Sequence, residues 1–211
     1  MASCPRCSAN LETPLGCLAC GSVFPLGDDV GALDPFAILG LAPAYSIDLQ
    51  DLRRRLLRFS RLTHPDFFAT AGKAEKENAE RATAVLNSAF ALLSDDAARA
   101  DQLVRSLGGP DENTERAMPK EFLMEVLEWN EFLEEARHAQ ATPAEGAAAL
   151  RRDLEARREQ ALATVAKLLE PLPSPGSESL RDARRALNVV RYVDRALSEL
   201  ESLRLSRAEA R

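Results

Sequence analysis

The sequence predicts an all-α protein with a helical hairpin, a C-terminal three-helix bundle and a small metal-binding module at the N-terminus. Three observations support this fold class. Only 5% of the 211 residues are aromatic, and alanine, leucine, arginine and glutamate dominate the second half, which is typical of helices. Apolar residues recur at helical spacing from the middle of the chain onward. The four cysteines all lie within the first 20 residues.

The cysteines form two C-x2-C pairs, nine residues apart, which are Cys4, Cys7, Cys17 and Cys20. In a reducing cytosol, clustered cysteines favour a metal over disulfides. Four thiolates suit tetrahedral Zn²⁺ with no open position, so we predict a structural zinc site in a module at residues 1–24. Two disulfides, a rubredoxin-like iron site and a dithiol redox enzyme are the alternatives. We expect metal binding to fold this small module, and a linker at residues 25–33 to keep the helices independent of it.

The predicted hairpin begins after a short helix in the segment 34–41. Asp34 is suited to cap this helix, Pro35 takes its first helical position and Gly40 ends it. Two longer helices follow, in the segments 45–64 and 75–96, and pair as an antiparallel hairpin. Helical spacing predicts their inward-facing residues, which are Leu49, Leu52, Leu56 and Phe59 on the first and Ala82, Val85, Ala89 and Leu92 on the second.

The tip of the hairpin carries the tripeptide His64-Pro65-Asp66. Pro65 disfavours a helical conformation at His64, so the helix ends there. The segment around His64 contains no serine or cysteine nucleophile signature, which argues against catalysis. The sequence also provides too few further ligands for a metal site at His64. A turn residue and a solvated basic face are the simpler interpretations. However, three arginines align on one face of the preceding helix, namely Arg54, Arg58 and Arg61. Few acidic residues lie beside them, so this face favours an acidic protein partner.

The order of these segments resembles a known module. A short helix, a basic helix, His-Pro-Asp and a helix ending in LNSAFALLSD are similar to the J domain, which stimulates ATP hydrolysis by DnaK-type chaperones. The resemblance implies a J domain at residues 34–108. It also implies that the chaperone binds the tripeptide His64, Pro65 and Asp66 and the basic face of Arg54, Arg58 and Arg61.

Three long helical patterns follow, at about 118–140, 144–171 and 177–206, and short connections between them predict a three-helix bundle within residues 109–211. The first pattern is apolar on two sides. One side is a core stripe, which consists of Phe122, Val126, Trp129, Leu133 and Ala136. The other side carries Leu123, Met124 and Leu127, beside Glu128 and Glu131. Such a helix either lies between two layers, for example against the J domain, or leaves one side for a partner.

Three segments carry a second resemblance, namely RADQLVRSLGG, EFLMEVLEWNEFLEE and VVRYVDRAL. They are similar to the HscB-type co-chaperones of iron–sulfur cluster assembly, and the resemblance covers about Asp34 to the C-terminus. It implies that the bundle is an HscB oligomerisation-type domain that binds an IscU-type scaffold protein. The implied scaffold-binding residues are Leu123, Met124, Leu127, Glu128, Glu131 and, on the last helix, Tyr192. The tetracysteine module resembles the zinc module of the longer, eukaryotic-type members of this family, so we expect a zinc-knuckle appendage.

Together these patterns predict an adaptor rather than an enzyme. It would stimulate the ATPase of a DnaK/HscA-type chaperone and deliver the iron–sulfur scaffold protein to it. A general J-domain co-chaperone for misfolded clients is the alternative. A net charge of −6 disfavours nucleic-acid binding. No stretch of about 18 apolar residues predicts a membrane span, and no leader is apparent, so we expect a cytoplasmic protein.

Overall fold

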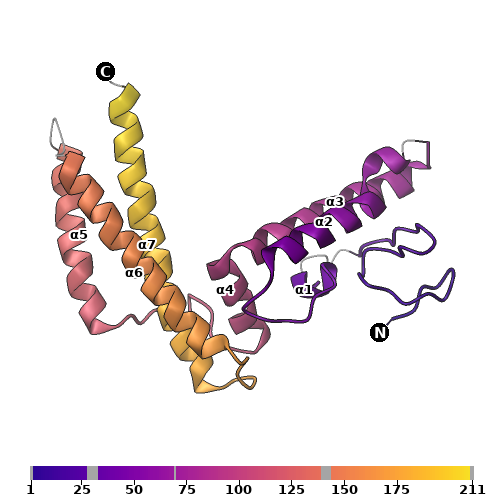
Figure 1. Ribbon diagram of the computed structural model, residues 1–211, viewed down its shortest axis with the longest axis horizontal. Coiled ribbons are helices and arrows are strands. Elements are labelled where there is room, and N and C mark those ends of the chain that lie inside the picture. The colour runs from indigo at the N-terminus through magenta and orange to yellow at the C-terminus, as the bar shows by residue number, and fades with distance from the viewer. Residues whose placement is uncertain (1, 28–32, 69, 139–143, 210–211) are drawn as a thin grey trace. The chain divides into compact units, whose positions relative to one another are not determined.

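The computed structural model describes residues 2–27, 33–68, 70–138 and 144–209, and it confirms the all-α class (Figure 1). Among these residues β-structure is confined to isolated bridges near the cysteines. The chain forms two compact units, residues 1–99 and 100–211. The boundary between the units falls inside α4 (Asp96–Ser106), a few residues before the end of the predicted J domain. None of the described helices is both long and apolar enough to cross a membrane.

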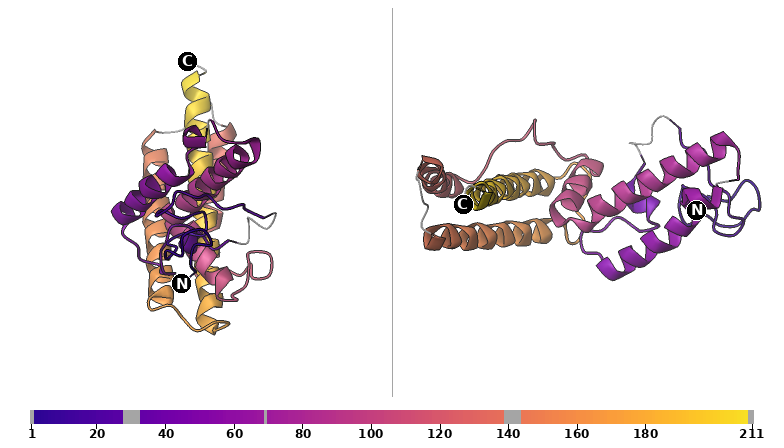
Figure 2. Two further views of the ribbon diagram at one scale, coloured as in Figure 1. Left: turned by 90° about the vertical axis from the view of Figure 1, so that its right-hand side faces the viewer. Right: turned by 90° about the horizontal axis from the view of Figure 1, so that it is seen from above.

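The first unit contains the hairpin. Helix α1 (Pro35–Ile38) begins where the Asp34 carboxylate accepts a hydrogen bond from the Phe36 amide, at 3.1 Å. Helices α2 (Leu49–Thr63) and α3 (Lys73–Ser94) run side by side (Figures 1 and 2), joined by the 3₁₀ turn η2 (Pro65–Phe68). Asp48 caps α2 through the Gln50 amide.

The buried face of α3 is turned slightly from the predicted one. Its buried residues are Ala79, Ala82, Leu86, Ala89 and Leu93. Val85 and Leu92 lie one position to the side and are only half-buried. On α2 the predictions hold for Leu52 and Phe59, whereas Leu49 in the first turn is 52% exposed. Spacing alone does not choose between neighbouring apolar positions, because both fall within the same wide stripe.

The cysteine module is part of the first unit, not an independent appendage. The buried Thr13 hydroxyl donates to the Ile38 carbonyl, at 2.8 Å. The carboxylate of Glu12 accepts two hydrogen bonds from the Arg58 guanidinium, at 2.6 and 2.7 Å. A Cβ at Gly16 would lie 3.1 Å from the Leu62 side chain, so the module backbone lies directly on α2. The expectation that a linker keeps the module apart from the helices is therefore corrected.

The second unit contains the three predicted long helices, α5 (Lys120–His138), α6 (Ala144–Leu169) and α7 (Glu178–Glu209). The core stripe of α5 is confirmed, with Phe122, Trp129, Leu133 and Ala136 buried and Val126 half-buried. The Phe122 ring meets the Trp129 and Tyr192 rings edge-on, at centroid distances of 5.6 and 5.7 Å. This contact joins α5 to α7.

The loop before α5 is held against α7. The Asn188 side-chain amide donates to the carbonyls of Glu115 and Ala117, at 2.9 and 3.2 Å. The buried Arg184 pairs with Asp101 and donates to the Pro110 carbonyl. The loop therefore has a defined backbone path, although most of its side chains are exposed.

Candidate functional site

The four cysteines converge on one point. Their sulfur atoms all lie within 4.8 Å of one another, and all four thiols are free. The Sγ atoms of Cys4 and Cys20 are 3.7 Å apart, and those of Cys7 and Cys17 are 3.6 Å apart. Cys4 and Cys17 are buried, whereas Cys7 is exposed. The predicted clustering is confirmed, and the set offers four ligand atoms to one metal ion.

The charges of these thiols differ. The hydroxyl of Ser22 and its backbone amide lower the pKa of Cys20 to about 6, which favours the thiolate form of this residue. For Cys7 the backbone amide of Ala9 favours the thiolate, but desolvation and hydrogen bonds with the other three thiols raise the pKa to about 12. Four sulfurs this close cannot all be charged without a cation between them. The donor set therefore fits a thiophilic, tetrahedral ion such as Zn²⁺.

The His-Pro-Asp tripeptide lies at the exposed end of α2. His64 ends the helix in an extended conformation, and its side chain is 50% exposed. Its Nδ1 accepts a hydrogen bond from the Asp66 amide, at 3.3 Å, and lies 3.6 Å from the Asp66 carboxylate. Phe67 is 70% exposed and meets the His64 ring edge-on. No hydroxyl or thiol of the described residues is hydrogen-bonded to His64, so the geometry presents a surface and no nucleophile–base pair.

The basic face of α2 has more acidic partners than the sequence suggested. Arg54 pairs with Asp51 at 3.1 Å, and Arg58 pairs with Glu12. Arg61 is exposed and has no acidic partner among the described residues. Asp51 lies three residues from Arg54 and was visible in the sequence, but the Glu12 contact spans 46 residues and no local pattern reveals it. The three arginines remain on the surface of the helix that leads to the tripeptide.

The predicted scaffold-binding residues lie together on the second unit. We call Leu123, Met124 and Leu127 the exposed apolar stripe, because their exposed fractions are 44%, 64% and 56%. Glu128 and Glu131 on the same helix are also exposed. Tyr192 reaches α5 from α7, since its hydroxyl donates to the Asn130 side-chain oxygen at 3.0 Å. The side of α5 that periodicity left out of the core is therefore accessible.

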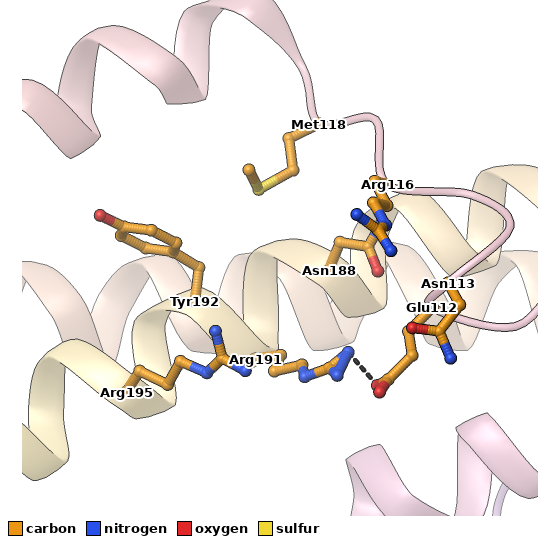
Figure 3. A pocket seen from close by; sticks show the side chains of 8 residues that line it. All are labelled: Glu112, Asn113, Arg116, Met118, Asn188, Arg191, Tyr192 and Arg195. Atoms are coloured by element: carbon orange, nitrogen blue, oxygen red, sulfur yellow. Dashed lines mark ion pairs between the residues drawn. The ribbon is translucent and has the colours of Figure 1, made fainter.

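The sequence patterns did not reveal a pocket on the second unit. It has a volume of about 370 Å³ and lies between the loop before α5 and helix α7 (Figure 3). The i, i+4 spacing of Arg191 and Arg195 was the available signal, but their loop partners are set by the tertiary fold. We call it the arginine pocket, and it is lined by Glu112, Asn113, Arg116, Met118, Asn188, Arg191, Tyr192 and Arg195.

Sequence comparisons connect the chain to one group of proteins. The family described as "HSCB C-terminal oligomerisation domain" matches residues 118–201. A "Co-chaperone protein HscB homolog" of Bordetella avium is 38% identical over 143 residues, which cover 67% of this chain and 82% of that protein. A protein of the same description from Mannheimia succiniciproducens is 26% identical over 175 residues, covering 81% of this chain and 95% of that protein.

Solved structures show the same fold. Human co-chaperone protein HscB aligns with a TM-score of 0.77 at 21% identity, covering 97% of this chain and 100% of the human chain. Chaperone HscB from Vibrio cholerae aligns with a TM-score of 0.66 at 23% identity, covering 82% and 99% of the two chains. At these identities the likeness concerns the fold. The larger coverage of this chain by the human structure extends the match toward the N-terminal module.

Proposed function

This chain belongs to the HscB family of co-chaperones, and on that premise we propose that it serves iron–sulfur cluster assembly by linking two proteins. One is a DnaK/HscA-type chaperone, whose ATPase it stimulates. The other is an IscU-type scaffold protein, which it delivers to that chaperone. The chain itself is not an enzyme in this proposal. It acts in the cytoplasm, and the metal in its cysteine module is structural Zn²⁺.

One observation carries the proposal, namely that each unit exposes its own candidate binding surface. The first unit exposes His64, Asp66 and the arginines of α2. The second unit exposes the apolar stripe on a helix whose other side is already buried. Exposed leucines and a flexible methionine, rimmed by carboxylates, are suited to contact with a partner protein.

The two surfaces have different physical roles. Basic side chains around His64 attract an acidic chaperone surface and raise the association rate at low salt. The stripe contributes affinity through burial of apolar area. Because one chain carries both surfaces, a bound scaffold is held at high effective concentration near the chaperone without any new contact.

The experiment separates the two surfaces with two variants. We expect His64→Gln to abolish stimulation of the HscA-type ATPase in a single-turnover assay and to leave scaffold affinity unchanged. The triple variant Leu123→Ala, Met124→Ala, Leu127→Ala should do the reverse. Each truncation at an interface centre costs about 1–2 kcal/mol of binding, so the triple variant should lose roughly a hundred-fold or more in affinity.

Normal ATPase stimulation by His64→Gln would refute the J-domain assignment. A triple variant that binds the scaffold as well as the parent would refute the scaffold site. The general co-chaperone alternative predicts that the parent protein binds unfolded polypeptides as tightly as the folded scaffold. Competition between the scaffold and a permanently unfolded protein measures this directly.

A further inference from the structure

Tyr192 connects the arginine pocket to α5, the helix that carries the exposed apolar stripe, because it lines the pocket and its hydroxyl donates to Asn130. Figure 3 shows Met118 from the loop and Tyr192 from α7 extending into the same space, whereas Arg195 and Arg191 lie along α7. Tyr192 is held toward α5 by its contacts with Phe122 and Asn130. A protein bound to the stripe and to Tyr192 therefore reaches the pocket without leaving the second unit.

The pocket concentrates positive charge that the chain itself does not neutralise. Most described arginines of the second unit pair with a carboxylate, as Arg157 does with Glu125 and Arg158 with Asp194. Among the described residues of the second unit, Arg116, Arg152 and Arg195 have no acidic partner. Two of these three, Arg116 and Arg195, line the pocket.

The pocket already accepts one carboxylate from its own chain. Arg191 forms an ion pair with Glu112, which Figure 3 marks with a dashed line. This pair shows the ligand chemistry that suits the site. An arginine guanidinium binds a carboxylate through two parallel hydrogen bonds, and the apolar walls at Met118 and Tyr192 suit the methylene stem of an acidic side chain.

The loop wall is formed before any ligand binds. Asn188 fixes the backbone on both sides of Arg116 through the carbonyls of Glu115 and Ala117. Arg185 also pairs with Glu115, at 3.3 Å. The backbone around Arg116 therefore loses little conformational entropy when a ligand binds, and this preorganisation favours affinity.

We propose that the arginine pocket binds an Asp or Glu side chain of the scaffold protein that occupies the apolar stripe. This inference rests on the proposed function. Glu128 and Glu131 lie on the same helix as the stripe, and the pocket arginines lie on the Tyr192 side. The proposed scaffold-binding surface therefore combines acidic, apolar and basic groups. Such charge complementarity fixes the orientation of a bound partner and excludes wrong ones.

The test measures binding of the apo IscU-type scaffold by calorimetry to the full chain at two salt concentrations. Arg195→Glu and Arg116→Glu should each lower affinity about ten-fold or more, a change of about 1.4 kcal/mol. Arg152→Glu makes the same charge change on α6, outside the pocket, and is expected to change affinity less than about two-fold, which is within the usual effect of a distant exposed charge. Arg195→Gln provides a gentler variant, and circular dichroism confirms that each variant is folded.

Two further measurements identify the ligand. Glu112→Gln removes the internal carboxylate and should increase scaffold affinity, because Arg191 becomes available. In the scaffold, single Asp→Asn and Glu→Gln changes should include one that lowers affinity for the parent protein but has no further effect on Arg195→Glu. Such non-additivity identifies residues in contact.

The outcomes separate this inference from the proposed function. If the pocket variants match Arg152→Glu while the triple stripe variant loses binding, the pocket proposal is overturned and the proposed function stands. If no scaffold carboxylate couples to Arg195, the pocket proposal is also overturned. If the stripe variant retains full binding, the proposed function itself fails.

Discussion

Loss of the metal site should destabilise the hairpin helices as well as the cysteine module. We consider Cys17→Ser, because Cys17 is buried and is one of four clustered ligand candidates. Without a bound metal the module has too few residues to hold its own core. Its contacts with α1 and α2 are then lost together, so the effect reaches residues that no metal touches.

The contacts between the module and the helices give the size of the expected loss in the free energy of unfolding. The buried hydrogen bond from Thr13 to Ile38 contributes about 0.5–1.5 kcal/mol. The exposed pair of Glu12 and Arg58 contributes about 0–1 kcal/mol. Leu62 is only 7% exposed beneath Gly16 and loses part of its burial, worth about 1–2 kcal/mol. Together these contacts contribute about 1.5–4.5 kcal/mol to the free energy of unfolding, which corresponds to roughly 6–36 °C in the melting temperature of a unit of this size.

The assay is hydrogen–deuterium exchange of peptides from α2 and α3, compared between the parent protein and Cys17→Ser. We expect faster exchange in both helices. The single tryptophan, Trp129, is buried in the second unit and provides an internal control, since its fluorescence transition in urea should not move. Thr13→Val keeps all four cysteines and should lose only the stability that the hydrogen bond from Thr13 to Ile38 contributes.

Full protection of α2 and α3 in Cys17→Ser, together with free exchange of the module peptides, would contradict this coupling between module and hairpin. That result would mean that the contacts of Glu12, Thr13 and Gly16 add nothing to hairpin stability. The module would then be independent of the helices, as the predicted linker at residues 25–33 led us to expect.

Three further outcomes are expected in the second unit. Leu133→Ala should lower the free energy of unfolding in urea by about 2–5 kcal/mol, because this side chain is only 3% exposed. Leu127→Ala should lower it by less than about 1 kcal/mol, because this side chain is 56% exposed. Equal losses would contradict the assignment of the two faces of α5. Gly109→Ala should cost about 1–3 kcal/mol, since its Cβ would lie 2.7 Å from a Val104 methyl and 2.9 Å from Leu180, and an unchanged urea midpoint would exclude this close contact. Acid should loosen the loop before α5. The pKa of Asp111 is lowered mainly by the Thr114 hydroxyl, and that of Glu115 by the Ala117 amide and nearby arginines. Both folded-state pKa values lie below their ordinary ones, so this stabilisation is present above about pH 4.5 and is lost as pH falls through the folded values. Amide exchange of the loop should therefore become faster on acidification, after correction for the intrinsic exchange rates. Corrected exchange rates that do not depend on pH would contradict this stabilisation by Asp111 and Glu115.

Local chemistry accounts for what the sequence predicted well. The cap at Asp34, the helix end at His64 and the core stripe of α5 depend on neighbours within about one helical turn or on a simple period, which a sequence displays directly. The C-x2-C spacing likewise brings cysteine ligands together through short turns. The exposed apolar stripe was predictable for a related reason, because one helix cannot bury both of its sides against a single layer.

Long-range contacts account for what only the tertiary structure decided. Glu12 and Arg58 are 46 residues apart, and their pairing attaches the module to the hairpin despite the predicted linker between them. The arginine pocket needs a loop and a helix that are more than 70 residues apart along the chain, brought together by Asn188. Which charged side chain meets which partner, and which arginine is left without one, depends on the packing of distant segments. The sequence by itself thus determined the helices, the cysteine cluster and the two exposed surfaces, and the fold decided which charges remain free at those surfaces.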